Sequence, residues 1–153
     1  MINVDVFSDE KNWSTKLKKK QLFFNKVCNS FPKKYKFSKK KISFSLLLSN
    51  NKKIKKLNKD FRNKNKPTDI LSFPFSKKNK IKKKAYIGDI IISYDFLNKP
   101  KKQKIKIFRE KLIKIFIHGF LHLLNFDHKR DIDFKKMLKE EKRIFKSVIS
   151  KIN

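Results

Sequence analysis

Cysteine is almost missing from this chain of 153 residues, which has a single one, Cys28. One thiol cannot form a disulfide within the chain, and a protein without disulfides fits a reducing compartment. Long apolar runs are missing too, since none approaches the roughly 20 residues that a membrane-spanning helix needs. The first residues, Met1 to Phe7, include an acidic residue and no long apolar core, so they are not typical of a secretory signal. We therefore expect a cytoplasmic protein without a membrane partner.

Acidic residues are also scarce, with 13 Asp and Glu against 43 Lys and Arg, which gives a net charge of +30. Such an excess of positive charge indicates a polyanionic partner such as RNA or the ribosome. Codon usage offers a second explanation, because all but four of the basic residues are lysine, 16 residues are phenylalanine and only 2 are glycine. AT-rich codons favour this composition, and part of the charge then reflects mutational drift on a solvated surface. The charge supports nucleic-acid binding without establishing it.

Strand and helix patterns intermingle along the chain, without an internal repeat or a domain linker. Strands are predicted at residues 2–7, 41–48, 70–75 and 86–93. Helices are predicted at residues 13–31 with Ser14 as the cap, at 51–61, from Pro100 in the first turn to Leu124, and from Asp131 or Asp133 onward. A polar loop is expected at residues 62–69 and a basic turn at 76–84. We expect one domain over residues 1–153, of class α+β (mixed α/β), with a mixed sheet of about four strands packed with helices.

Two of these strands have predicted positions in the sheet. Pro74 has no N–H to donate, so the strand at 70–75 is expected at an edge or to end there. The strand at 86–93 is apolar on both faces and is expected at the centre. The core stripe predicted for the long helix contains Ile105, Phe108, Leu112, Ile115, Phe116, Phe120 and Leu123. The last helix is expected to present Phe134, Leu138, Phe145, Val148 and Ile149.

All three histidines of the chain lie in one stretch, at positions 118, 122 and 128. His118 and His122 are four residues apart, a spacing that places two side chains on one face of a helix. His128 comes too late to share that face unless the chain first turns back. Asn125 is where we expect this turn, because asparagine tolerates the left-handed conformation of a helix C-terminal cap.

Two interpretations of these histidines compete, a metal site and three ordinary hydrogen-bonded side chains. The stretch around them is apolar, so the helix end is expected to be buried, and burying imidazoles without partners costs on the order of 1–3 kcal/mol each. One bound ion removes that cost, and zinc is the ion that best suits imidazole nitrogen. Three protein ligands leave a coordination position for water or substrate, which is the pattern of catalytic rather than structural zinc.

The spacing of the three histidines is also that of metzincin proteases. Those enzymes place a glutamate directly after the first histidine as general base, and this chain has Gly119 there. A zincin-like metallopeptidase is therefore the second hypothesis. Glycine inside a helix costs about 1 kcal/mol relative to alanine, so Gly119 also predicts a close approach of another backbone or of substrate.

Three segments carry a closer similarity. They are Leu57-Asn58 through Phe61-Arg62 with Lys66 to Pro74, then Gly88 to Ser93, and His118 to His128. Over about residues 40–145 they resemble the YbeY family of bacterial metal-dependent endoribonucleases and rRNA maturation factors. The chain departs from the family at Asn125, usually Gly, and at Phe126, usually Tyr. Asparagine keeps the left-handed conformation accessible.

The resemblance implies one zinc ion on His118, His122 and His128, a catalytic role for Arg62, and a zincin-like metal helix beside a mixed sheet. It also implies cleavage of single-stranded RNA in ribosomal RNA processing, at the 3′ end of small-subunit 16S rRNA, and in ribosome quality control. The implied partners are rRNA and the small ribosomal subunit, with no DNA expected. A non-catalytic ribosome-binding protein with a structural metal is a third hypothesis.

Arg62 suits this chemistry because a guanidinium grips phosphate in a planar, permanently charged fork. A surface salt bridge is the alternative role for it. The general base stays open among Asp127, which is also placed to hold an imidazole N–H, Asp69 and Asp89. The attacking group also stays open, between water and the 2′-hydroxyl of the RNA.

Overall fold

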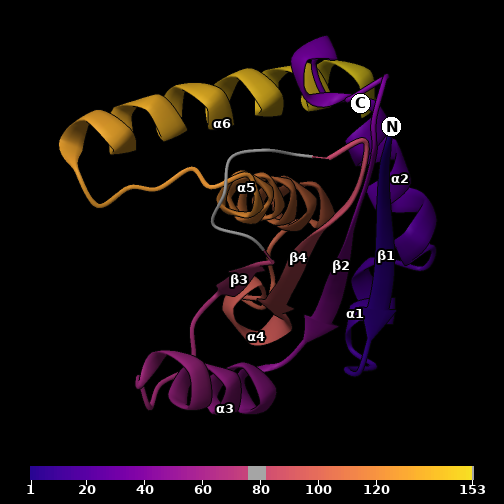
Figure 1. Ribbon diagram of the computed structural model, residues 1–153. Helices are drawn as coiled ribbons and strands as arrows, with labels where there is room; N and C mark the ends of the chain where they lie inside the picture. Colours follow the sequence, from indigo (N-terminus) through magenta and orange to yellow (C-terminus); the bar gives the residue numbers. More distant parts are fainter. Residues whose placement is uncertain (76–81, 153) are drawn as a thin grey trace.

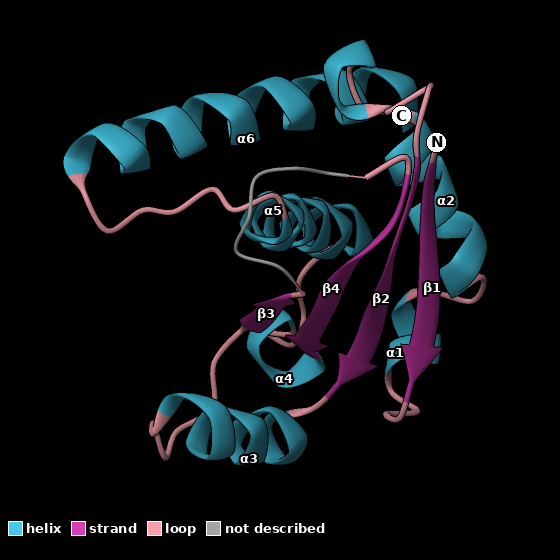
Figure 2. Cartoon of the chain, in the orientation of Figure 1, coloured by secondary structure: helices cyan, strands magenta, loops and turns pink. Residues whose placement is uncertain are grey.

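A mixed sheet of four strands forms the centre of the computed structural model, which describes residues 1–75 and 82–152 (Figures 1 and 2). Its strands are β1 (Ile2–Ser8), β2 (Lys41–Ser49), β3 (Ile70–Pro74) and β4 (Lys84–Ser93), in the order β1-β2-β4-β3. β1, β2 and β4 are parallel, and β3 is antiparallel to β4. The sheet confirms the predicted class, the central place of the strand at 86–93 and the edge position of the strand that ends at Pro74.

Six α-helices accompany the sheet in the described residues. They are α1 (Trp13–Lys16), α2 (Lys20–Asn29), α3 (Asn51–Arg62), α4 (Tyr94–Leu97), α5 (Ile105–Leu123) and α6 (Asp131–Ile152), with a short 3₁₀ helix, η1 (Lys33–Tyr35). Most of the basic turn predicted at 76–84 lies outside the described residues. The expected helices at 51–61 and from Asp131 onward are confirmed.

The single helix predicted at 13–31 is wrong, because the chain forms α1 and α2 with a break between them. Leu17 ends α1 in an extended conformation and is buried in the core. Packing of this one side chain outweighs the local helical pattern. Ser14 lies inside α1 and accepts a hydrogen bond from Lys20 Nζ, so it does not cap the helix.

The predicted start of the long helix is also wrong. Pro100 belongs to a turn before α5, which begins at Ile105. Side chains hold this turn in place: Gln103 Nε2 donates to Leu97 O at 2.6 Å, and Lys111 Nζ donates to Lys99 O at 2.8 Å. Contacts of this kind between side chains and backbone leave no periodic pattern in the sequence. The short helix α4, just before this turn, was not predicted either.

The two faces of the sheet are covered unequally. The main core lies between the sheet and helices α2 and α5, where the rings of Phe44, Phe116 and Phe120 pack together. On the other face α3 covers a smaller cluster of Ile54, Leu71 and Ile91. α6 crosses α5 on the side away from the sheet (Figure 1).

Three residues of the predicted core stripes lie outside the core, and one of them, Leu138, is partly buried. Ile105 is 43% exposed and Phe134 is 52% exposed, because each stands near the start of its helix, where no other element covers it. The remaining residues of the stripe on α5 are buried or partly buried in the main core.

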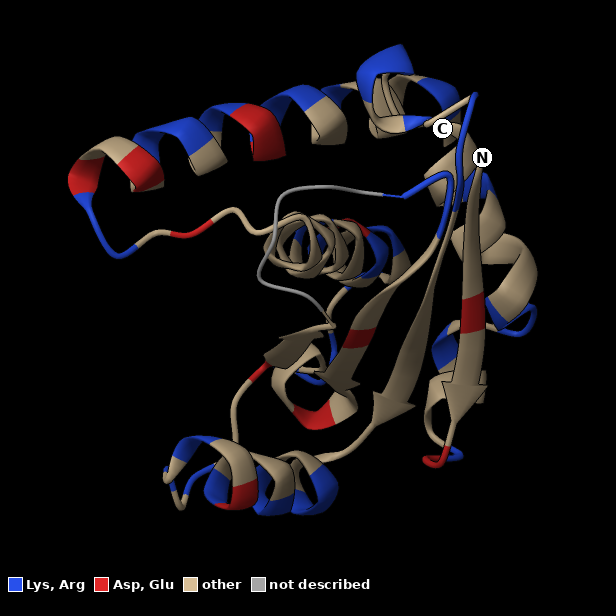
Figure 3. Ribbon diagram, in the orientation of Figure 1, with Lys and Arg blue, Asp and Glu red and all other residues tan. Residues whose placement is uncertain are grey.

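The positive charge is spread over the molecule. Lysine and arginine occur on α3, α5 and α6 and in the loops, while the strands carry few charges (Figure 3). The charge alone therefore does not single out one binding surface. Among the described helices, none combines the length and apolar character needed to cross a lipid bilayer.

Candidate metal centre

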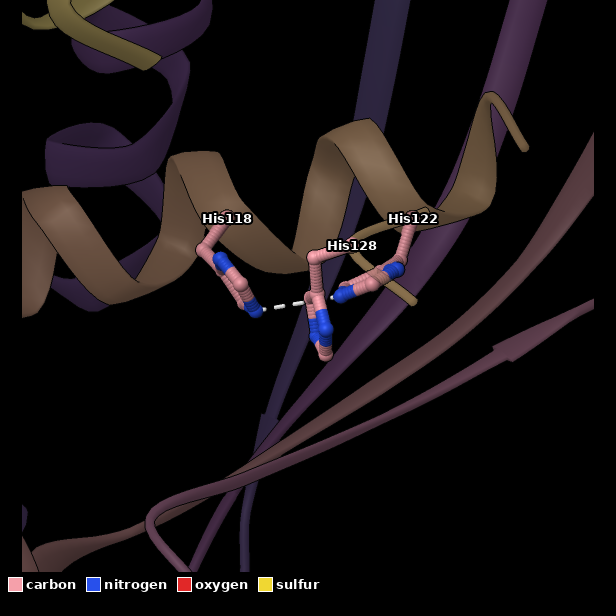
Figure 4. A group of neighbouring side chains, drawn as sticks. All are labelled: His118, His122 and His128. Carbon is pink, nitrogen blue, oxygen red and sulfur yellow. Dashed lines mark hydrogen bonds between the residues drawn. The ribbon is translucent and has the colours of Figure 1, made fainter. Parts of the chain in front are cut away.

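The end of α5 and the turn after it bring the three histidines together. Asn125 follows the helix with φ of +67°, which confirms the predicted left-handed turn. Its N–H donates to His122 O at 2.9 Å, and Phe126 N donates to Leu121 O at 3.0 Å, so the chain reverses tightly. His128 thereby returns to the face that presents His118 and His122 (Figure 4). One ligand-capable nitrogen from each of the three rings lies within 4.8 Å of the other two.

Hydrogen bonds determine which ring nitrogens face the centre. His122 Nδ1 lies 2.9 Å from Phe126 O, and His118 Nδ1 lies 2.6 Å from Glu141 Oε1. A carbonyl and an ionised carboxylate only accept, so each Nδ1 carries the proton and donates. In the neutral rings the Nε2 atoms then have free lone pairs.

These two Nε2 atoms lie only 3.0 Å apart (Figure 4). Two lone pairs at that distance repel each other unless a cation or a proton lies between them. Burial, followed by the neighbouring His118, lowers the pKa of His122 to about 4, so this ring is neutral near pH 7. Neutral imidazoles with outward Nδ1–H groups held by acceptors are the usual form of zinc ligands. The donor set therefore fits a zinc ion.

Gly119 lets the metal-bearing helix lie close to the sheet. A Cβ atom at this position would come within 2.7 Å of Ile70 Cδ1 and 3.0 Å of Ser72 Oγ, both on β3. Ser72 Oγ also donates to Gly119 O at 3.3 Å. The close approach is thus made by side chains of the sheet and not by the backbone or substrate that the sequence predicted, and it places α5 directly against the edge strand.

A cleft of about 560 Å³ opens between α5 and β3, and all three histidines line it. Its other lining residues are Arg62, Thr68, Asp69, Ile70, Leu71, Ser72, Pro74, Asn125, Phe126, Asp127 and Lys129. One side of the histidine cluster therefore faces an open space large enough for part of a substrate, as a three-ligand site requires.

Arg62 stands at the mouth of this cleft, as the last residue of α3. Its guanidinium donates to Ser72 O at 2.9 Å and lies 5.7 Å from the ring centroid of Phe73. Within the described residues no carboxylate forms an ion pair with it, which speaks against the surface salt bridge. A second hollow shares Arg62 with the cleft and adds Lys64 and Lys66. Positive charge thus continues from Arg62 along the loop after α3.

The three candidate bases occupy different places. Asp69 and Asp127 line the cleft, and each binds backbone: Asp69 Oδ1 accepts from Ile70 N at 2.8 Å and Asp127 Oδ1 from His128 N at 2.7 Å. Asp89 does not line the metal cleft. It accepts a hydrogen bond from the Tyr86 hydroxyl and borders the hollow next to α3.

Sequence reasoning missed the groups that hold the imidazoles. The suggested partner, Asp127, binds backbone instead, and the partners are Glu141 on α6 and the carbonyl of Phe126. No sequence signal points to Glu141, which follows the last histidine by more than three helical turns. Backbone carbonyls carry no side-chain signal at all.

The fold and the cleft define a class: an α+β protein with an open three-imidazole centre between a helix end and an edge strand. The family described as Endoribonuclease YbeY matches residues 6–149. An Endoribonuclease YbeY of Pelagibacter ubique is 60% identical over 152 residues, covering 99% of each chain, and one of Ehrlichia canis is 36% identical, covering 87% of this chain and 83% of its own. This chain belongs to the YbeY family, as its motifs predicted.

A solved structure shows the same fold. The solution structure of the Thermotoga maritima protein TM1509 superposes with a TM-score of 0.57 at 23% identity, covering 98% of this chain and 90% of that one. At this identity the likeness concerns the architecture alone.

Proposed function

We propose that this chain is an endoribonuclease that cleaves single-stranded RNA with the help of one zinc ion bound by His118, His122 and His128. We further propose that it acts in ribosomal RNA processing, at the 3′ end of small-subunit 16S rRNA and in ribosome quality control. Residues 1–153 then form a single catalytic domain, located in the cytoplasm.

One observation carries the proposal: three imidazoles, two of them with their Nε2 lone pairs free, line an open cleft that Arg62 borders. The family to which the chain belongs is described as an endoribonuclease, which makes RNA the substrate class. The open coordination position and the adjacent fixed charge are what phosphodiester cleavage requires.

The residues of the chain divide this work between them. A bound zinc ion supplies a Lewis acid and an activated water at neutral pH. The ion is held in place by His118, His122 and His128. Gly119 lets their helix lie against β3. Arg62 is pre-oriented by Ser72 O and Phe73, and its remaining donors bind the phosphate and stabilise charge that develops on its oxygens.

The geometry gives no support to the peptidase alternative. Metzincins need a glutamate at position 119, and this chain has glycine there, packed against Ile70 and Ser72. The nearby Glu141 carboxylate faces His118 Nδ1, on the side of the ring away from the Nε2 centre. A casein digestion assay is expected to show no activity with zinc present, and zinc-dependent digestion would favour the peptidase.

The direct test is cleavage of a single-stranded RNA by purified variants with and without a chelator. We expect His118→Ala to abolish metal-dependent cleavage and to retain the wild-type circular dichroism spectrum. Arg62→Ala is expected to lower the cleavage rate roughly 100-fold without loss of zinc, the scale for one preorganised donor. Arg109→Ala, an exposed arginine far from the metal cleft, is the matched control and should cleave like wild type.

Unchanged cleavage by folded His118→Ala would refute the assignment of the site. The ribosome-binding alternative predicts a different outcome: with all three histidines replaced, RNA affinity and ribosome maturation in cells would both stay intact. We expect the triple variant to bind RNA but to leave precursor 16S rRNA unprocessed.

A further inference from the structure

Glu141 occupies a position on α6 that helical spacing assigns to the core. It lies four residues after Met137 and three before Ile144, both of which are buried on the face turned toward α5. A carboxylate on such a face needs a partner, because burying it unpaired is costly. Its partner is His118: Glu141 Oε1 lies 2.6 Å from His118 Nδ1, and the two side chains are 26% and 32% exposed.

The neighbouring glutamate has a different contact. Glu140 accepts from Lys34 Nζ at 3.1 Å and is 8% exposed, so it ties α6 to η1. Glu141 ties the same helix to the metal-bearing helix. Within the described residues, the His118–Glu141 pair is the one hydrogen bond between side chains of α5 and α6. The Phe145 ring adds a contact with Lys114.

We propose that Glu141 is a positioning residue of the metal centre, and that its carboxylate couples ion binding to the docking of α6 on α5. This inference rests on the proposed function only in taking the three histidines as zinc ligands. Glu141 keeps the proton of His118 on Nδ1 and the ring turned so that Nε2 faces the other two imidazoles. Without this acceptor the ring is free to rotate or to change tautomer, either of which removes a lone pair from the centre.

Charge strengthens the same effect. Three neutral imidazoles leave the full double charge of a zinc ion in a chain of net charge +30. A carboxylate hydrogen-bonded to one ligand offsets part of that charge and makes the imidazole a stronger donor. Coupling free energies are reciprocal. The free energy that docking of α6 adds to zinc binding therefore equals the free energy that bound zinc adds to the docking of α6.

The test measures zinc affinity by competition with a chromophoric chelator, so it needs no catalytic assay. We expect Glu141→Ala to bind zinc 10–100-fold more weakly than wild type, the usual effect of removing such an acceptor. Glu141→Gln keeps an oxygen that accepts from His118 Nδ1. Its zinc affinity is expected to lie between those of wild type and Glu141→Ala. Glu110→Gln, the same change on α5 at a glutamate whose carboxylate forms no hydrogen bond with a described residue, is the matched control and should bind like wild type.

Two further measurements separate positioning from a loss of structure. In wild type, zinc should slow amide hydrogen exchange in the first half of α6. In Glu141→Ala zinc should give less protection, and the loss should extend along α6 past the turn nearest His128. With cobalt in place of zinc, the visible absorption bands should shift in Glu141→Ala and not in Glu110→Gln.

The outcomes distinguish this inference from the proposed function. If wild type binds zinc and both Glu141 variants bind it equally tightly, with unchanged exchange of α6, Glu141 has no positioning role and the zinc enzyme stands. If wild type itself does not bind zinc, the metal centre of the proposed function fails, and this inference fails with it.

Discussion

Replacing Gly88 tests how tightly β4 is enclosed beside the metal centre. Gly88 has φ of +141°, a conformation that residues with a side chain rarely adopt. A Cβ atom there would lie 2.2 Å from the backbone oxygen of Phe73 on β3 and 2.9 Å from Leu123 Cδ2 at the end of α5. The strained backbone costs about 1–3 kcal/mol, and the overlap with a fixed carbonyl costs a similar amount. Gly88→Ala is therefore expected to lose about 3 kcal/mol or more of the free energy of unfolding.

Thermal unfolding followed by circular dichroism measures this loss. In a domain of this size 1 kcal/mol shifts Tm by about 2–4 °C, so Gly88→Ala should melt about 6–12 °C below wild type. Gly119→Ala is the matched control. There the Cβ atom meets only the ends of side chains, Ile70 Cδ1 first, and alanine regains about 1 kcal/mol of helix propensity. Its Tm should change by less than about 4 °C. Equal shifts for the two variants, or a shift below 2 °C for Gly88→Ala, would refute the reasoning.

Further predictions concern the ion and the core. Zinc at about 100 times its Kd should stabilise the folded state by about 2.7 kcal/mol and raise Tm by roughly 5–11 °C, and His118→Ala should lose that rise in the same thermal scan. Phe116→Ala empties a fully buried site against the rings of Phe24 and Phe44 and should cost about 3–5 kcal/mol in urea unfolding. Phe134→Ala, at a half-exposed site on α6, should change stability by less than about 0.5 kcal/mol. Similar losses for these two variants would contradict the assigned core.

Local patterns were sufficient for much of the fold. The apolar character of residues 86–93 on both faces and the position of Pro74 correctly predicted a central and an edge strand, because burial on both faces and a missing N–H act on the strand itself. Local patterns failed where contacts between distant segments override them. Leu17 interrupts a helical pattern because its side chain enters the core. Phe134 belongs to a helical stripe that the core covers only farther along α6, at Phe145, Val148 and Ile149.

The amino-acid sequence alone determined that His118, His122 and His128 share one helix end, since helical spacing and the left-handed preference of Asn125 are properties of neighbouring residues. Only the tertiary structure decided which nitrogen of His118 and of His122 faces the centre and what lies opposite it. Glu141 is far along the chain, and the packing of α6 on α5 brings it to His118. Arg62 reaches the same cleft because β3 lies against Gly119. Hydrogen-bond partners depend on distances that packing sets, and sequence spacing does not contain them.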